Sequence, residues 1–171
     1  MTPLRVLLAV VLAGALTIAA APAVEDARAT NAVSDAQTAA DDVQDGVVAL
    51  AASTPAPPGT LGASRTVTVF LPEPDATTAR ARFLVGVGGG DATTTDVLVV
   101  HAGDQTQTTT LPVDIRVVDN GSIAPDTTGL LVTDRATLVL RYITYDGRPT
   151  VLVTPRDGAR VYTGGRVHGG L

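Results

Sequence analysis

The feature of this sequence that most constrains its fold is a nearly uninterrupted apolar run from Val6 to Val24. An α-helix rises about 1.5 Å per residue, so a run of this length is sufficient to cross the roughly 30 Å hydrocarbon core of a bilayer. We therefore predict a transmembrane signal-anchor over residues 1–24 that contacts membrane lipid through residues 6–24. The alternative is a buried helix of a soluble protein, which the position of the run near the N-terminus disfavours.

The same run can also be interpreted as a cleavable signal peptide. Arg5 supplies a basic start and Ala21-Pro22-Ala23 a small-residue cleavage site, although the apolar centre exceeds the usual length of about 7 to 15 residues. Cleavage would leave a secreted protein. Because Arg5 precedes the run while Glu25 and Asp26 follow it, we expect a cytoplasmic N-terminus and an extracellular C-terminal domain.

The composition indicates a salt-rich environment and argues against nucleic-acid binding. The chain has no lysine, its only glutamates are Glu25 and Glu73, and its net charge is −5. Acidic surfaces keep a protein hydrated in concentrated salt, which favours a halophilic archaeal source, although codon bias in a G+C-rich genome would leave a similar composition. Because nucleic-acid phosphates bind patches of Lys and Arg, we expect no nucleic-acid partner. The absence of cysteine excludes disulfides and thiolate metal sites.

Residues 25–52 have the spacing of an amphipathic helical stalk. Apolar residues recur at intervals of three and four, while aspartate, asparagine and glutamine occupy the other faces. The stripe predicted to take part in helix packing consists of Val33, Ala36, Ala40, Val43, Val47 and Leu50. Two partners for this stripe are left open, another subunit or the globular domain of the same chain. Pro22 either begins this helix or kinks it relative to the apolar run.

Residues 53–64 form a predicted Pro/Gly linker, because prolines cannot continue a helix. Residues 65–155 then have the alternating pattern of a β-rich extracellular domain, and the glycine and arginine content of residues 156–171 predicts a flexible tail. The predicted strands are 65–71, 81–87, 97–101, 106–111, 113–118, 136–145 and 150–154. The fold class is therefore α+β: a long N-terminal helix followed by a small, mainly antiparallel β domain, either a sandwich or a curved sheet.

The last two predicted strands form a β-hairpin. They are joined through Asp146-Gly147, a pair favoured where both residues of a two-residue turn need positive φ. In the first of these strands both faces are largely apolar. One face is therefore expected to meet the core and the other a helix or a second sheet.

Candidate catalytic and metal-binding motifs fail on their spacing. The glycines at 86–90 lack the third fingerprint glycine and a lysine, so they predict a turn in place of a phosphate loop. The acidic run 41–46 has valine where calcium needs a ligand, which favours a solvated helix face. His101 and His168 have no companions at metal-ligand spacing, and no serine lies in a Gly-x-Ser-x-Gly elbow. We therefore predict no catalytic, cofactor-binding or metal-binding residues, no cofactor and no enzymatic activity.

One modification motif fits the expected location. Asn120-Gly121-Ser122 matches the N-glycosylation pattern, in which Asn120 would carry the sugar outside the cell. The alternative, which we favour, is that an Asn-Gly pair is present because a tight turn requires it.

Several segments together resemble an uncharacterised domain-of-unknown-function family of halophilic archaea. They are the Arg5-bearing start with its apolar helix, the Val-Glu-Asp-Ala-Arg junction at 24–28, the alanine-rich amphipathic extension, the Pro-Pro-Gly break at 57–59 and the Leu-Pro-Val-Asp-Ile-Arg strand at 111–116. The resemblance implies a membrane-anchored protein associated with type IV pilus-like secretion or adhesion systems.

The architecture also resembles pilins and pseudopilins, in which a hydrophobic helix is prolonged into a stalk under a β domain. Those proteins carry a processing site, often with a glycine, before the apolar helix and an acidic residue early within it. Here no glycine precedes Val6, and Glu25 follows the run.

Two functions from different classes remain. The first is a structural or accessory component of a pilus-like or secretion assembly, which would form homo-oligomers or contact other assembly subunits. The second is a secreted or membrane-anchored extracellular binding module that recognises a surface polymer or glycan. The chain has no Trp, two Phe and three Tyr, so stacking platforms for sugars are scarce.

Overall fold

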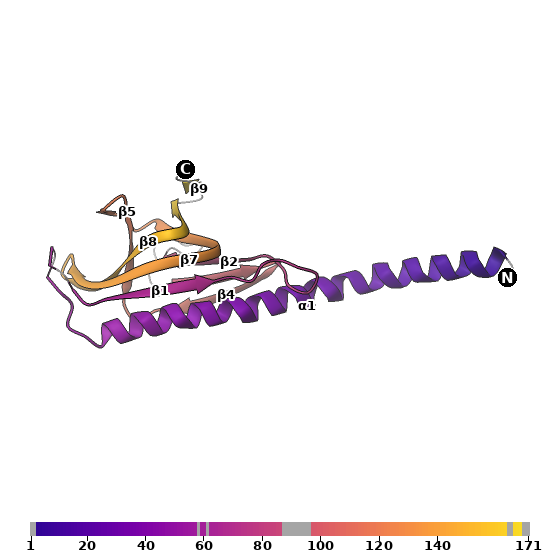
Figure 1. Ribbon diagram of the computed structural model, residues 1–171, viewed down its shortest axis with the longest axis horizontal. Helices are drawn as coiled ribbons and strands as arrows, with labels where there is room; N and C mark the ends of the chain where they lie inside the picture. The colour runs from indigo at the N-terminus through magenta and orange to yellow at the C-terminus, as the bar shows by residue number, and fades with distance from the viewer. Residues whose placement is uncertain (1–2, 58, 61, 87–96, 164–165, 169–171) are drawn as a thin grey trace.

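The computed structural model describes residues 3–57, 59–60, 62–86, 97–163 and 166–168 of the 171-residue chain. One long helix, α1 (Pro3–Ala51), lies along a β domain and projects well beyond it (Figure 1). The predicted α+β class is confirmed.

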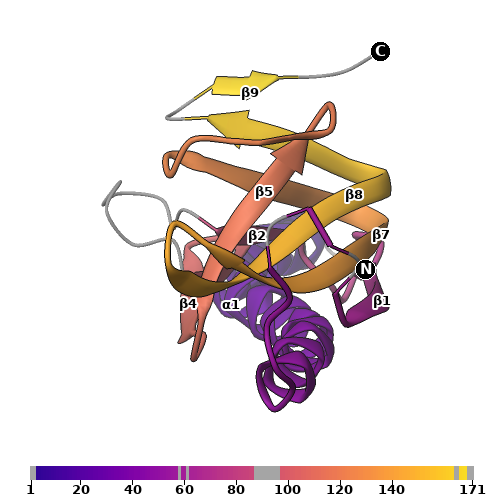
Figure 2. The ribbon, with the colours of Figure 1, turned by 90° about the vertical axis from the view of Figure 1, so that its left-hand side faces the viewer.

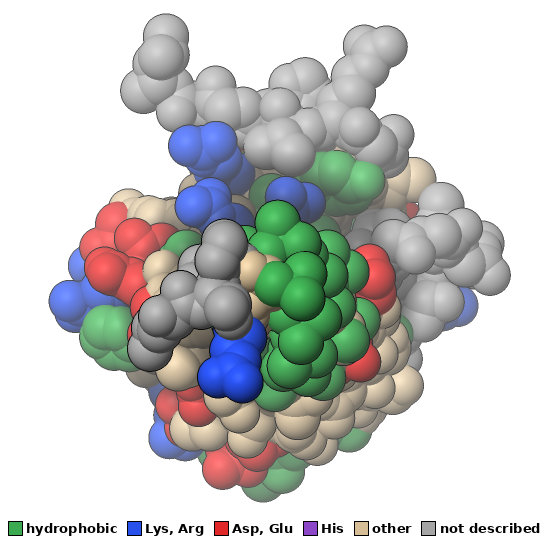
Figure 3. Space-filling model, turned by 90° about the vertical axis from the view of Figure 1, so that its right-hand side faces the viewer, with side chains coloured by type: hydrophobic (Ala, Val, Ile, Leu, Met, Phe, Trp, Pro, Cys, Tyr) green, Lys and Arg blue, Asp and Glu red, His purple; other side chains and the backbone are tan. Residues whose placement is uncertain are grey.

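Helix α1 is continuous through Pro22, so the predicted anchor and stalk form a single rod. From Leu4 to Ala27 every side chain that the structure describes is exposed. From Ala29 onward one face is buried. The projecting half is long and apolar enough to cross a membrane by length and composition, and none of it is buried in the β domain. Seen from its N-terminal end, hydrophobic side chains gather on this half (Figure 3).

The described strands follow the predicted ones closely up to residue 119. They are β1 (Ser64–Phe70), β2 (Ala81–Gly86), β3 (Val97–Ala102), β4 (Gln105–Thr110), β5 (Asp114–Asp119), β6 (Ser122–Ile123), β7 (Thr128–Tyr145), β8 (Arg148–Thr163) and β9 (Arg166–His168). The hairpin at Asp146-Gly147 is confirmed. Both turn residues have positive φ, 49° and 74°, and Tyr145 pairs with Arg148 across the turn.

The strands form one sheet in the order β4-β3-β2-β7-β8-β5-β6, with β1 paired to β7 and β9 paired to β8. All of the described pairings between strands are antiparallel except that of β5 with β8. The long strands β7 and β8 bend so that the sheet curls (Figure 2). Of the two predicted arrangements, the structure has the curved sheet.

The tail prediction for residues 156–171 is wrong over residues 156–163, which belong to β8. The β7–β8 register shifts on both sides of Thr137: residues 133–136 of β7 lie opposite Gly158 alone, and Arg156 is an extra residue of β8. The Asp157 carboxylate accepts a hydrogen bond from the Thr137 amide at 2.7 Å. Gly158 has φ +67°, and a Cβ there would lie 1.8 Å from the Arg135 carbonyl oxygen. Glycine at 158 therefore leaves room for the bulge of β7 and is not a sign of flexibility.

The predicted linker is tied to the sheet. Ala56 forms a bridge to Ile143 of β7: its amide donates to the Tyr142 carbonyl at 3.3 Å, and its carbonyl accepts from the Thr144 amide at 2.8 Å. Gly62 lies so close to β7 that a Cβ would be 2.5 Å from the Tyr142 carbonyl oxygen. Residues 56 and 62 of this segment are therefore held against β7.

The main core lies between α1 and the sheet. Five residues of the predicted packing stripe are buried there, namely Ala36, Ala40, Val43, Val47 and Leu50, and Val33 packs at the margin. Their partners are side chains of this chain's own strands, including Val67, Val69, Phe83, Leu138 and Leu140. The alternative of packing on the same chain is the one observed, so the stripe is not free to meet another subunit.

Neighbouring valines of α1 provide a test of this packing. Val47 is fully buried, whereas Val48 is 47% exposed. We expect Val47→Asp to lower the free energy of unfolding by at least about 3 kcal/mol, because it buries an unpaired charge. Val48→Asp should cost less than about 1 kcal/mol. Denaturant unfolding of both variants measures the difference, and equal losses would show that the helix does not pack on this face.

Two glycines at positive φ test the bulge. Gly158→Ala combines left-handed strain with a collision against the Arg135 carbonyl, so a loss of more than about 2 kcal/mol is expected. Gly147→Ala has φ +74° but nothing within 4 Å, so only the backbone strain of about 1 kcal/mol should remain. Thermal unfolding of the two variants makes the comparison. A Gly158→Ala protein as stable as Gly147→Ala would be inconsistent with the bulge geometry.

Candidate functional site

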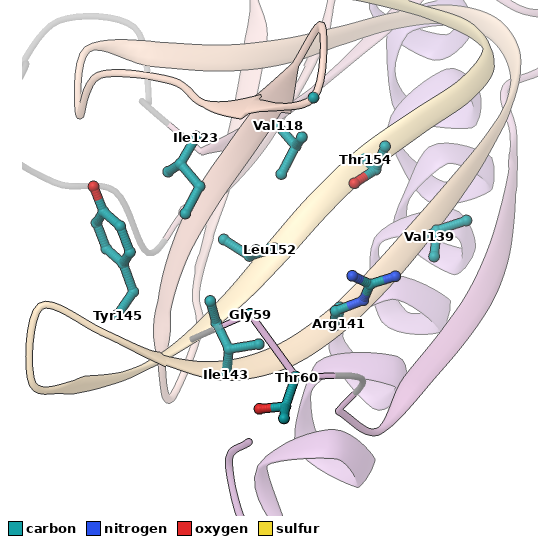
Figure 4. A pocket seen from close by; sticks show the side chains of 11 residues that line it. Gly59, Thr60, Val118, Ile123, Val139, Arg141, Ile143, Tyr145, Leu152 and Thr154 are labelled. Atoms are coloured by element: carbon teal, nitrogen blue, oxygen red, sulfur yellow. The ribbon is translucent and has the colours of Figure 1, made fainter. Parts of the chain in front are cut away.

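A groove lies on the face of the sheet opposite α1. Along β7, Leu138, Leu140 and Tyr142 point to the helix side, so Val139, Arg141 and Ile143 point to the other side. There they border a half-open cavity of about 500 Å³. The groove is lined by Gly59, Thr60, Val118, Gly121, Ile123, Val139, Arg141, Ile143, Tyr145, Leu152 and Thr154 (Figure 4).

Four strands and the linker build the groove. Strands β7 and β8 provide the floor, since Arg141 pairs with Leu152 and Val139 with Thr154. Strand β5, parallel to β8, and the short β6 provide a wall through Val118 and Ile123. The fixed linker closes the remaining side through Gly59 and Thr60. The face of β7 that points away from α1 is thus partly covered by β5 and β6, which belong to the same curved sheet.

The charges around the groove are uneven. Arg116, beside it on β5, pairs with Asp114 at 3.0 Å and with Asp126, and its guanidinium lies 5.9 Å from the centre of the Tyr145 ring. Arg141 has no ion pair or hydrogen bond to any side chain that the structure describes. Among the described residues that line the groove there is no carboxylate. These residues therefore offer apolar walls, the hydroxyls of Thr60, Tyr145 and Thr154, and one unneutralised cation.

This set of groups is suited to binding. The lining residues that the structure describes include no His, Asp or Glu that could act as a base for the hydroxyls of Thr60 or Thr154. Among the residues described, no three His, Asp or Glu side chains are close enough to hold a metal ion.

The other sequence candidates lie apart from the groove, except for the turn at Asn120. Asn120 and Gly121 form the two-residue turn between β5 and β6, with φ 48° and 79°. Asn120 is exposed, and Gly121 borders the groove. The Asn-Gly pair thus has the turn geometry that we favoured, and glycosylation of Asn120 stays a prediction.

The described residues of the other motifs lie in helix α1 or in strands of the sheet. Residues 41–46 are helical, so they form no calcium loop. His101 Nδ1 lies 2.8 Å from Thr106 Oγ1 across the β3–β4 pair, and His168 is in β9. Of the glycine-rich turn predicted at 86–90, Gly86 ends β2 and the other residues lie outside the described part of the chain.

A loop that sequence reasoning missed fastens the β domain to α1 where the helix leaves it. Arg28 donates to the Asp75 carbonyl at 2.5 Å, and Asn31 donates to the Thr77 carbonyl at 3.1 Å. The Asp75 carboxylate accepts the amides of Thr77 and Thr78, both at 2.7 Å, and the Thr77 hydroxyl. These bonds lower the pKa of Asp75, those from Thr77 most. The Asp-x-Thr-Thr pattern, which favours an Asx turn, was the available signal.

The helix, the curved sheet and the groove define an α+β domain with a projecting apolar helix. The chain belongs to the family described as a domain of unknown function (DUF7311), whose profile matches residues 3–156. No curated protein and no solved structure matches the chain.

The Asp75 turn predicts a pH-dependent contribution to stability. Because folding lowers the pKa of Asp75, its contribution is present above the ordinary aspartate pKa and is lost as the pH falls through the lowered value. We expect Asp75→Ala to be less stable than the natural protein at pH 7, with the difference vanishing in strong acid. Thermal unfolding at a series of pH values measures it. A difference independent of pH would contradict the role of the ionised carboxylate.

Proposed function

We propose that this protein is a non-enzymatic, single-pass membrane-anchored surface protein that serves as a structural or accessory component of a pilus-like or secretion assembly. Its N-terminus would be cytoplasmic and its β domain extracellular. The supporting observation is the division of α1 into an exposed apolar half and a half packed on the sheet of the same chain. Pilins and pseudopilins share this layout.

The exposed half of α1 presents a large apolar surface, and exposing such a surface to water is energetically unfavourable. Leu4, Leu7, Leu8, Val10, Val11, Leu12, Leu16 and Ile18 are each at least 60% exposed. Lipid or the same segment of other subunits can cover such a surface. Since the stripe from Val33 to Leu50 is already covered within the chain, the projecting half is the part of α1 left for assembly.

The transition between the two halves fits a membrane surface. Glu25 is the first charged residue after the apolar run. Arg28 pairs with Glu25 at 2.9 Å and also donates a hydrogen bond to the Asp75 carbonyl. The β domain would therefore sit directly above the headgroups on a rigid helix. The order of charges, Arg5 before the apolar run and Glu25 with Asp26 after it, supports the proposed orientation.

The groove supports the second function, an anchored binding module. Its apolar walls and single free guanidinium offer less to a polar glycan than to a partly apolar ligand. An assembly component could also carry such a site.

Cysteine scanning tests the assembly role, because the chain has no cysteine of its own. Single cysteines placed from Leu7 to Val24 should form disulfide-linked dimers in native membranes. If subunits pack through one face of α1, crosslinking should recur every three or four residues. Gel electrophoresis of oxidised membranes measures the yield at each position.

The matched control is Ala52→Cys, at an exposed position directly after α1 ends, at the opposite end of the helix from the projecting half (Figure 1). Its yield reports random collision. Yields from Leu7 to Val24 that are uniform, or no higher than that of Ala52→Cys, would refute the assembly role while leaving the anchor in place.

A further inference from the structure

We propose that the groove on the outer face of the sheet binds a small amphiphilic carboxylate, an apolar chain that ends in an anionic group, and that Arg141 receives the carboxylate. This inference does not depend on the assembly role, because the groove lies within one chain and on the face away from α1.

The shape of the groove suits a short apolar chain. Its volume of about 500 Å³ falls within the range of about 300 to 1,000 Å³ that is usual for small-molecule sites. Ile143 and Leu152, on the floor, are almost fully buried, and Val118 and Ile123 form an apolar wall. An aliphatic chain lying here would exclude water from both surfaces, which is the main source of affinity for such ligands.

The charge of the groove indicates which end group the ligand carries. Arg141 lies between Val139 and Ile143 on β7, and its side chain is exposed to solvent at the groove (Figure 4). The neighbouring Arg116 is neutralised by Asp114 and Asp126, whereas the described lining residues include no carboxylate. A planar guanidinium binds a carboxylate through two parallel hydrogen bonds. A ligand carboxylate could therefore pair with Arg141 while its apolar chain lies along the groove.

The rest of the groove agrees with a compact anionic head and an apolar tail. The hydroxyl of Thr154, on β8, can donate to a further carboxylate oxygen, whereas that of Thr60 already donates to the Pro57 carbonyl. The ring of Tyr145, the one aromatic side chain among the described lining residues, is already engaged by Arg116. Among these residues a sugar would find no free stacking platform, and a ligand with carboxylates at both ends would find a single free cation.

Octanoate is a suitable probe because it is soluble and has the required chemistry. The full-length protein, in lipid nanodiscs with methyl-labelled Ile, Leu and Val, would be titrated with octanoate and followed by NMR. We expect saturable shifts of the Ile143 and Leu152 methyl signals. Empty nanodiscs give the fraction of octanoate taken up by lipid, so that the free concentration is known.

Two comparisons isolate the role of Arg141. The neutral isostere octanamide should bind about tenfold more weakly than octanoate, and Arg141→Gln should abolish this preference. The matched control Arg82→Gln removes the same charge from an exposed position on β2 and should leave octanoate affinity unchanged. Retained methyl spectra of both variants establish that they fold.

Three results of the titrations with octanoate and octanamide would overturn the proposal. They are equal affinity for octanoate and octanamide, unchanged octanoate affinity in Arg141→Gln, and the absence of saturable shifts at Ile143 and Leu152. Shifts that depend on the number of protein copies per nanodisc, and not on octanoate, would assign the groove to a second copy of the chain and would also overturn it.

Discussion

The packing of the second half of α1 on the sheet is the interaction on which the rest of the structure depends. Val43 and Val47 are fully buried against strands that include Leu138 and Leu140, and small residues such as Gly46 let the helix approach closely. A Cβ at Gly46 would lie 3.0 Å from both Leu140 and Val67. Because the same rigid helix continues past the β domain, this packing also fixes where the apolar half begins. The stripe that packs on the core and the exposed apolar segment are thus two parts of one helix.

The long strands β7 and β8 connect the core to the groove. One face of β7 completes the core under α1, and the other forms the floor of the groove. The bulge of β7 opposite Gly158 allows the pair to bend, and the parallel addition of β5 to β8 places a wall beside that floor. A strand with two apolar faces normally needs cover on both. Here the cover of the second face is incomplete, which leaves Ile143 and Leu152 at the bottom of a cavity.

Local features could be predicted where a short-range rule decides the structure. The turn at Asp146-Gly147 follows from positive φ in two-residue hairpins, and strands up to residue 119 follow from alternation. The tail was misjudged because glycine and arginine content does not distinguish a flexible segment from a bulged strand whose partner is β7. The Asp75 loop was missed for a similar reason, since its meaning depends on Arg28 and Asn31, more than forty residues away along the chain.

The sequence alone determined the apolar helix, the stripe from Val33 to Leu50, the α+β class and the position of the linker, because periodicity and proline act over a few residues. Only the tertiary structure decided that the stripe packs on its own chain, that Pro22 lies within one continuous rod, and that Arg141 borders a groove whose described lining residues include no carboxylate. Each of these depends on contacts between residues distant in sequence. A strand pattern gives the alternation of faces, but the curl of the sheet determines what each face meets.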